Sequence, residues 1–198
     1  MEIKNIKLVD TEVALVIDDF EGDKKLFFSK VGGSDFGYIK SYELDSKFHF
    51  QYLGISFINF NAEHFISFFS CIDSFSLAKG DYIIILFENE IKLSFPFQSS
   101  PSGDKNSHRN NCRLTLEELK IFATKKMIKW KLINKRKNLY TIGGYMDKKR
   151  DAIYITKNEA NVLMKIMVFK YIEGCQKLFS DKRMFSNEEE TWIKKIIF

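Results

Sequence analysis

DYIIILFENEIKLSFPF, residues 81–97, is the clearest β-hairpin in the sequence and decides the fold class. An apolar run leads into a polar turn at Glu88–Glu90, and residues 92–95 then alternate between polar and apolar side chains. This alternation is typical of strands that bury one face. Proline cannot donate a ladder hydrogen bond, so Pro96 predicts a strand end or a sheet edge.

Strand patterns recur on both sides of this hairpin. Residues 12–30 and 128–142 each contain two apolar-rich runs around a polar turn, which predicts two more hairpins. The segments 36–44 and 48–60 are rich in Phe, Tyr and Ile, as strands are.

Helix starts are marked by a Ser or Thr followed three residues later by Glu, an arrangement called a capping box. The sequence has three: Thr115 with Glu118, Thr156 with Glu159, and Ser186 with Glu189. The second box opens the longest expected helix, residues 157–179, and the third opens a final C-terminal helix. A shorter helix capped by Asn61 is also expected, with one apolar face made of Phe65, Phe68, Phe69 and Ile72.

These elements predict an α+β fold. We expect a largely antiparallel sheet with helices packed on one face and two C-terminal helices. The 198 residues suit a single domain, 1–198, with a possible division into a β-rich part, 1–80, and a hairpin-helix part, 81–198. A hydrophobic content of 45% with 20 phenylalanines favours a packed core over disorder.

Cysteine usage and hydropathy predict a cytoplasmic location. Cys71, Cys112 and Cys175 are odd in number and far apart, which is not a disulfide framework and fits a reducing compartment. Charged residues interrupt the first twenty residues, unlike a signal peptide, and no apolar run approaches the ~20 residues that span a bilayer. No membrane partner is therefore expected.

The polar segment 97–112 predicts a long solvated loop. Ser102, Gly103, Lys105, His108 and Arg109 could gather around an anion, but the second glycine of a phosphate loop is absent. His108 and Cys112 are four residues apart and lack the further ligands that zinc requires. No metal site is expected there.

The charge of the chain is concentrated in one short segment. The whole chain has a net charge of +5, yet residues 125–150 hold ten Lys or Arg against one Asp, and residues 1–124 are net negative. A basic hairpin here could contact nucleic-acid phosphates, with Tyr140 and Tyr145 as stacking surfaces, or it could be a solvated sheet face. The candidate cations are Lys129, Lys131, Lys135, Arg136, Lys137, Lys148, Lys149 and Arg150.

One pattern keeps an enzymatic function open. Asp81 precedes an apolar strand, and Glu90-Ile91-Lys92 begins the partner strand. This arrangement resembles the core of the restriction-endonuclease-like nucleases. The resemblance implies that Asp81 and Glu90 would hold a divalent metal and that Lys92 would help to position or activate water. It covers about a dozen residues, and ordinary turn acids with an outward lysine are the alternative.

No other catalytic or cofactor motif stands out. His49 and His64 have no nucleophile signature nearby, and no glycine-rich nucleotide fingerprint follows a strand. No cofactor is expected.

The expected helix 157–179 is apolar on two sides. One broad face would enter the core, while a second stripe would be sandwiched inside the domain or meet a partner. The candidate partner-binding residues are Val162, Ile166 and Phe169, with Trp192 on the final helix.

Three functional hypotheses follow. The first is a non-enzymatic adaptor that docks a protein partner or a second copy of itself through the C-terminal helices. The alternative is a nucleic-acid-binding protein that uses residues 125–150. The third is a metal-dependent nuclease that uses Asp81, Glu90 and Lys92.

Overall fold

The computed structural model describes residues 2–8, 11–17, 23–30, 39–43, 52–72, 75–103, 108–145 and 156–178, with Asn187 and Thr191. Two helices lie in these ranges, α1 (Leu116–Thr124) and α2 (Lys157–Leu178), together with a short 3₁₀ turn, η1 (Glu88–Glu90). The strands are β1 (Glu2–Leu8), β2 (Thr11–Ile17), β3 (Lys24–Lys30), β4 (Ile39–Glu43), β5 (Tyr52–Phe60), β6 (Glu63–Ser70), β7 (Tyr82–Phe87), β8 (Lys92–Pro96), β9 (Ser102–Gly103), β10 (His108–Arg113), β11 (Met127–Asn134) and β12 (Leu139–Gly144).

All these strands belong to one sheet, and each recorded pairing is antiparallel. The main path runs β1-β2-β3-β5-β4-β12-β11-β7-β8. In this path β3 and β4 pair with different parts of one edge of β5. The opposite edge of β5 pairs with β6, which in turn pairs with β10, and β10 pairs with β9. The α+β class with a largely antiparallel sheet is therefore confirmed.

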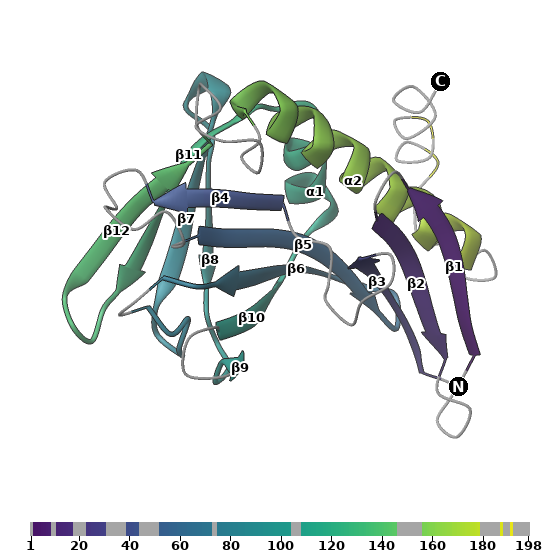
Figure 1. The fold of residues 1–198 in the computed structure, drawn as a ribbon, viewed down its shortest axis with the longest axis horizontal. Coiled ribbons are helices and arrows are strands. Elements are labelled where there is room, and N and C mark those ends of the chain that lie inside the picture. The colour runs from purple at the N-terminus through teal and green to yellow at the C-terminus, as the bar shows by residue number, and fades with distance from the viewer. Residues whose placement is uncertain are drawn as a thin grey trace.

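The sheet is strongly curved, with β7, β8, β11 and β12 at one end and β1 to β3 at the other (Figure 1). Helix α2 runs along the upper side between these ends and contacts α1 and strands β2 to β5. The narrower expectation that the helices pack on one face stays a prediction.

The three predicted hairpins are present as β2–β3, β7–β8 and β11–β12. The turn of the central hairpin is η1, where Asn89 and Glu90 have positive φ values of 59° and 61°. Pro96 ends β8, which has β7 as its only strand partner in the described part of the sheet.

Two of the predicted capping boxes are also present. In α1, the Thr115 hydroxyl accepts from the Glu118 amide at 3.2 Å, and the Thr115 amide donates to the Glu118 carboxylate at 2.8 Å. Thr156 and Glu159 repeat this exchange at the start of α2. The predicted final helix, with Ser186, Glu189 and Trp192, lies outside the described residues.

The short helix expected after Asn61 is wrong, because this segment is strand β6. Asn61 and Ala62 have φ values of 47° and 72°, as the two central residues of a tight hairpin turn require, and they join β5 to β6. Strand β6 then pairs with β5 on one side and β10 on the other. Its backbone amide and carbonyl groups are thus hydrogen-bonded, as they would be in a helix.

The loop expected over residues 97–112 is wrong in part, because it contains β9 and β10. Asn110 takes an inward position in β10 and is only 3% exposed. Its amide nitrogen donates to the carbonyls of Leu77 at 2.8 Å and Ser99 at 3.1 Å. Asn110 is therefore a polar residue at a core position, and its hydrogen bonds make this burial possible. It interrupts the polar-apolar alternation by which a strand is recognised in the sequence.

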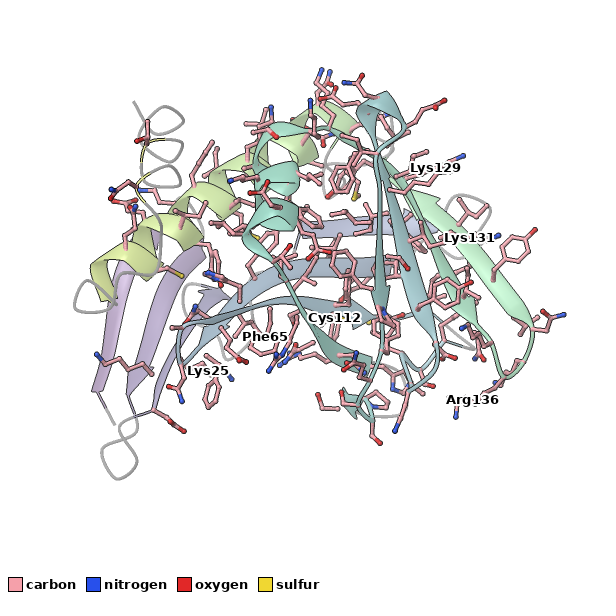
Figure 2. The ribbon with its side chains drawn as sticks, turned by 180° about the vertical axis from the view of Figure 1, so that it is seen from behind. Lys25, Phe65, Cys112, Lys129, Lys131 and Arg136 are labelled. Carbon is pink, nitrogen blue, oxygen red and sulfur yellow. The ribbon has the colours of Figure 1, made fainter. Side chains whose placement is uncertain are left out.

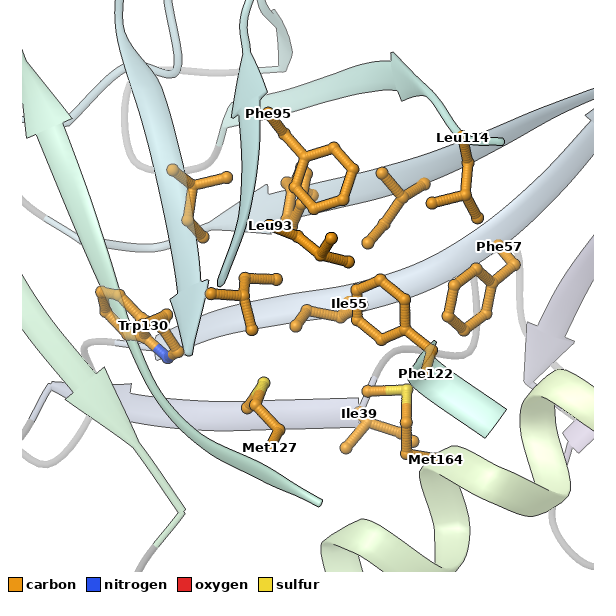
Figure 3. Close-up of a cluster of buried hydrophobic side chains, with 14 of the residues drawn as sticks. Ile39, Ile55, Phe57, Leu93, Phe95, Leu114, Phe122, Met127, Trp130 and Met164 are labelled. Atoms are coloured by element: carbon orange, nitrogen blue, oxygen red, sulfur yellow. The ribbon is translucent and has the colours of Figure 1, made fainter. Parts of the chain in front are cut away.

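The core lies between the curved sheet and the two helices (Figure 3). The Phe122 ring of α1 is fully buried and lies 5.1 Å from Phe87, 5.4 Å from Phe57 and 6.3 Å from Phe95, measured between ring centroids. The phenylalanines of β5, β7 and β8 therefore meet around one helix residue.

Two residues of helix α2, Asn161 and Tyr171, bind it to the sheet through polar contacts. Asn161 accepts from the Met127 amide at 2.8 Å and donates to the Lys157 carbonyl at 2.8 Å. The buried Tyr171 hydroxyl donates to the Ile58 carbonyl at 3.1 Å and lies 2.6 Å from Nδ1 of His64. Burial raises the pKa of Tyr171 well above its ordinary value, so it stays a hydrogen-bond donor.

The sheet crosses the possible boundary at residue 80. Strand β4 pairs with β12, and β6 pairs with β10, so both parts of the chain contribute to one set of ladders. Within the described residues, no helix is long and apolar enough to cross a membrane.

Candidate nucleic-acid interface

The outward side of strands β8, β7, β11 and β12 forms one continuous surface. In β7, Ile83, Ile85 and Phe87 point into the core, whereas the alternate residues are partly exposed on the other side. We call this side the outer basic face and define it by Tyr82, Ile84, Leu86, Lys92, Ser94, Lys129, Lys131, Ile133, Tyr140 and Ile142.

Strand register arranges this face in rows. In the first row, Lys92 lies opposite Leu86, and Leu86 lies opposite Lys129. A second row places Ile84 opposite Lys131, and Lys131 opposite Ile142. Lysines therefore alternate with aliphatic side chains, because the residues of paired positions share a face.

The charge of this face has one sign. Strands β7, β8, β11 and β12 contain no Asp or Glu, while three lysines lie on their outward side. The turn between β11 and β12 adds the exposed Lys135, Arg136 and Lys137. Figure 2 shows Lys129 and Lys131 projecting away from the sheet, with Arg136 at the end of the hairpin.

Two tyrosine rings are covered by lysines on this face. The Nζ atom of Lys131 lies 4.0 Å from the ring centroid of Tyr140, and that of Lys135 lies 5.0 Å from the ring centroid of Tyr82. Both distances are within the range of a cation–π interaction, which holds each ammonium group over a ring. Tyr140 is nevertheless 62% exposed, so its ring is accessible.

A pocket of about 260 Å³ opens on the same face. Its apolar part comes from Ile84, Leu86 and Ile142, with Trp130 beside them. Lys92, Lys129 and Lys131 line it as well, so cationic and apolar side chains alternate across it.

The structure does not bring the three nuclease candidates together. Asp81 lies before one end of β7, whereas Glu90 lies beyond the other end, six strand residues away, or roughly 20 Å at about 3.3 Å per residue, and Lys92 pairs with Leu86 near that second end. Lys92 instead joins Lys129 across Leu86. In the described part of the chain, no three His, Cys, Asp or Glu side chains are grouped as metal ligands would be.

Asp81 has a different environment from the one the nuclease pattern implies. Its side chain is 1% exposed, and neither carboxylate oxygen has a hydrogen-bond partner within the described residues. Its recorded ion pair is with Arg136, whose Nη2 lies 3.9 Å away on a largely exposed side chain. The buried carboxylate of Asp81 is therefore the counter-charge of Arg136, in the turn between β11 and β12.

Replacing Asp81 with asparagine is expected to leave the free energy of unfolding unchanged or raise it by about 1 kcal/mol, because a buried charge without hydrogen bonds is removed. The variant Arg136→Gln should lower it by about 1–3 kcal/mol, since the carboxylate then loses its counter-charge. Urea unfolding measures both, with Lys137→Gln as the neutral control. A lower free energy of unfolding for Asp81→Asn, together with an unchanged one for Arg136→Gln, would contradict this account.

Two further residues considered from the sequence, Tyr145 and Cys112, are buried. Tyr145, expected as a stacking surface, is wrong in that role because it is 5% exposed, and burial raises its pKa. Cys112 points into the core, where burial raises the pKa of its thiol to about 12, so it is protonated at neutral pH. Lys148, Lys149 and Arg150 lie outside the described residues.

The partner-binding candidates on α2 differ in exposure. Val162 and Ile166 are 56% and 41% exposed, and the neighbouring Leu163 is 42% exposed. Phe169 is partly buried against the core instead. Trp192 lies outside the described residues.

Sequence reasoning found the lysines of β11 and its turn but missed the rest of the outer basic face. Lys92, Ile84 and Leu86 come from another hairpin, and only the pairing of β7 with β11 places them beside Lys129 and Lys131. The available signal was the absence of acids in all four strands.

Comparison with known proteins gives no family for this chain: no protein-family model, curated protein or solved structure matches it.

Proposed function

We propose that the protein binds nucleic acid through the outer basic face. The observation that carries this proposal is the register of β8, β7, β11 and β12, which gathers lysines from two separate hairpins on one side of strands that contain no Asp or Glu. Such a surface can neutralise phosphates and release their counterions, which is the main source of nucleic-acid affinity.

The spread of the cations supports a polymer over a small anion. Lys129 and Lys135 are six residues apart along one hairpin, or about 20 Å at roughly 3.3 Å per strand residue. A single phosphate or carboxylate would contact only part of this span. A polyanion with regularly spaced charges matches all of it, and the accessible ring of Tyr140 adds a stacking surface.

The experiment is a salt titration of binding to a labelled single-stranded oligonucleotide, followed by fluorescence anisotropy. For single strands, the slope of log affinity against log salt is about −0.7 per neutralised phosphate, so three to six contacts predict a slope between about −2 and −4. Absence of binding at about 50 mM salt, or binding that ignores salt, overturns the proposal. The proposal agrees with the cytoplasmic location that the cysteine pattern predicts.

A second candidate function is the adaptor hypothesis, in a self-association form. It is favoured by the exposed apolar side chains of Val162, Leu163 and Ile166 on α2. Here we propose a second copy of the chain as the partner. Sedimentation equilibrium should then show a dimer that Ile166→Asp converts to a folded monomer, and a monomer at every concentration of the unaltered protein would refute it.

A further inference from the structure

We propose that the outer basic face selects single-stranded nucleic acid by seating one unpaired base in the pocket between Lys92, Lys129 and Lys131. This inference rests on the proposed function and specifies its ligand. It adds a reason for the apolar part of the surface, which phosphate contacts alone do not explain.

The pocket combines the two chemistries that a nucleotide presents. Ile84, Leu86 and Ile142 offer an apolar surface that a planar base can cover, which removes aliphatic area from water. The three lysines around them carry the positive charge that the flanking phosphates need. A ligand without an apolar ring leaves the aliphatic surface uncovered, and a ligand without negative charge leaves the lysines unpaired.

The pocket is small for an organic ligand. Its volume of about 260 Å³ lies below the roughly 300–1,000 Å³ of pockets that enclose drug-sized ligands. An unpaired base is free to enter such a space, whereas a base inside a duplex must first leave its stack, which costs free energy. Discrimination against duplexes follows from this cost.

A neighbouring base would find a second contact on Tyr140. The exposed ring lies in the next row of the face, because Tyr140 pairs with Ile133, two residues along β11 from Lys131. Lys131 covers this ring in the free protein. When a phosphate attracts the ammonium group of Lys131, the ring becomes free to stack on a base.

An acyl chain with an anionic head group would also fit a pocket lined by apolar and cationic side chains. The exposed lysines beyond the pocket, Lys135 and Lys137, favour the polymer, because a single head group leaves their charges unmatched. The test below includes this alternative as a result that overturns the proposal.

The test compares three probes of equal length on the unaltered protein: a single-stranded oligothymidylate, the same strand with abasic sites throughout, and a duplex. We expect the abasic strand and the duplex each to bind at least about 10-fold more weakly than the single strand at matched salt. Each base stacked on a protein surface contributes about this factor or more.

A pocket-filling variant provides the matched control. Ile142→Gln, which fills the pocket with a polar, non-aromatic side chain, should lower the preference for the single strand over the abasic strand to the part that Tyr140 supplies, while leaving the salt slope unchanged because all lysines remain. Leu139→Gln, at an exposed position of the same strand beyond the pocket, should keep the full preference.

The outcomes separate this inference from the proposed function. Equal affinity for the abasic and the normal strand overturns base seating but leaves nucleic-acid binding in place. Absence of salt-dependent binding to every nucleic-acid probe overturns the proposed function and this inference with it. Binding of anionic lipid vesicles with no binding of oligonucleotides assigns the pocket to an acyl chain and also overturns both.

Discussion

Replacing both Lys129 and Lys131 with glutamate is expected to lower the affinity for a single-stranded oligonucleotide by about 100-fold at low salt, or about 2.7 kcal/mol. The change removes two phosphate contacts and places two negative charges where the backbone of the ligand lies. Lys129 is exposed and Lys131 is held over Tyr140, so both are on the side of β11 that faces away from the core.

The control for this double variant keeps its charge change and moves it elsewhere. Lys157 and Lys165 lie on α2, outside the outer basic face. Replacing both with glutamate should change the affinity less than about 3-fold, because screening limits the reach of exposed charges to roughly 10 Å. Equal losses in the two double variants would show that net charge, and not this face, determines binding.

The lysine reversals should leave the fold intact. A cation–π contact at an exposed site contributes about 0.5–1 kcal/mol, so loss of the Lys131–Tyr140 contact removes a small part of a typical stability. Urea unfolding of the double variant checks this point before its binding is interpreted.

Replacing Phe122 with alanine is expected to lower the free energy of unfolding by about 3–5 kcal/mol. The ring is fully buried and touches phenylalanines of three strands, so its removal leaves a cavity that the sheet cannot close without moving several strands. Denaturant unfolding, followed through the fluorescence of the buried Trp130, measures the loss.

Two variants control the Phe122 prediction. Phe60→Ala changes a ring that is 42% exposed and should cost less than about 1 kcal/mol. If Phe122→Ala does not fold at all, Phe122→Leu keeps most of the volume and should cost about 1–2 kcal/mol. A loss below about 1 kcal/mol for Phe122→Ala would contradict the packing described for α1.

The elements that sequence reasoning predicted correctly have local causes. Capping boxes at Thr115 and Thr156 start α1 and α2 through hydrogen bonds within four residues. Hairpins such as β7–β8 follow from alternation around a short polar turn. Such signals need no knowledge of the rest of the chain.

Strand β6 could not be predicted in this way. Phe65, Phe68 and Phe69 recur at a spacing that suits a helix face, and nothing local excludes a helix. The choice is made by β5 and β10, which pair with both edges of this segment. Asn61-Ala62 was the local clue to a turn, and it lacks the glycine that usually marks one.

Only the local part of the candidate site could be predicted from the sequence. The basic run around Lys135 is visible in the sequence, but the contribution of Lys92 depends on the order β8-β7-β11, which joins residues about 40 positions apart. Asp81 is separated from Glu90 because the two acids lie beyond opposite ends of one strand. Nonlocal pairing therefore forms the outer basic face, whereas the extended length of β7 separates the nuclease candidates.

Ultraviolet cross-linking shows whether β7, β8, β11 and β12 carry a nucleic-acid interface. The unaltered protein is irradiated with an oligothymidylate of about 12 nucleotides, within the usual range of about 4–16 for such sites, and the cross-linked peptides are sequenced. We predict adducts on the β11–β12 hairpin, above all at the exposed Tyr140. Adducts confined to α2 or β1 to β3, or none at low salt, would contradict the account.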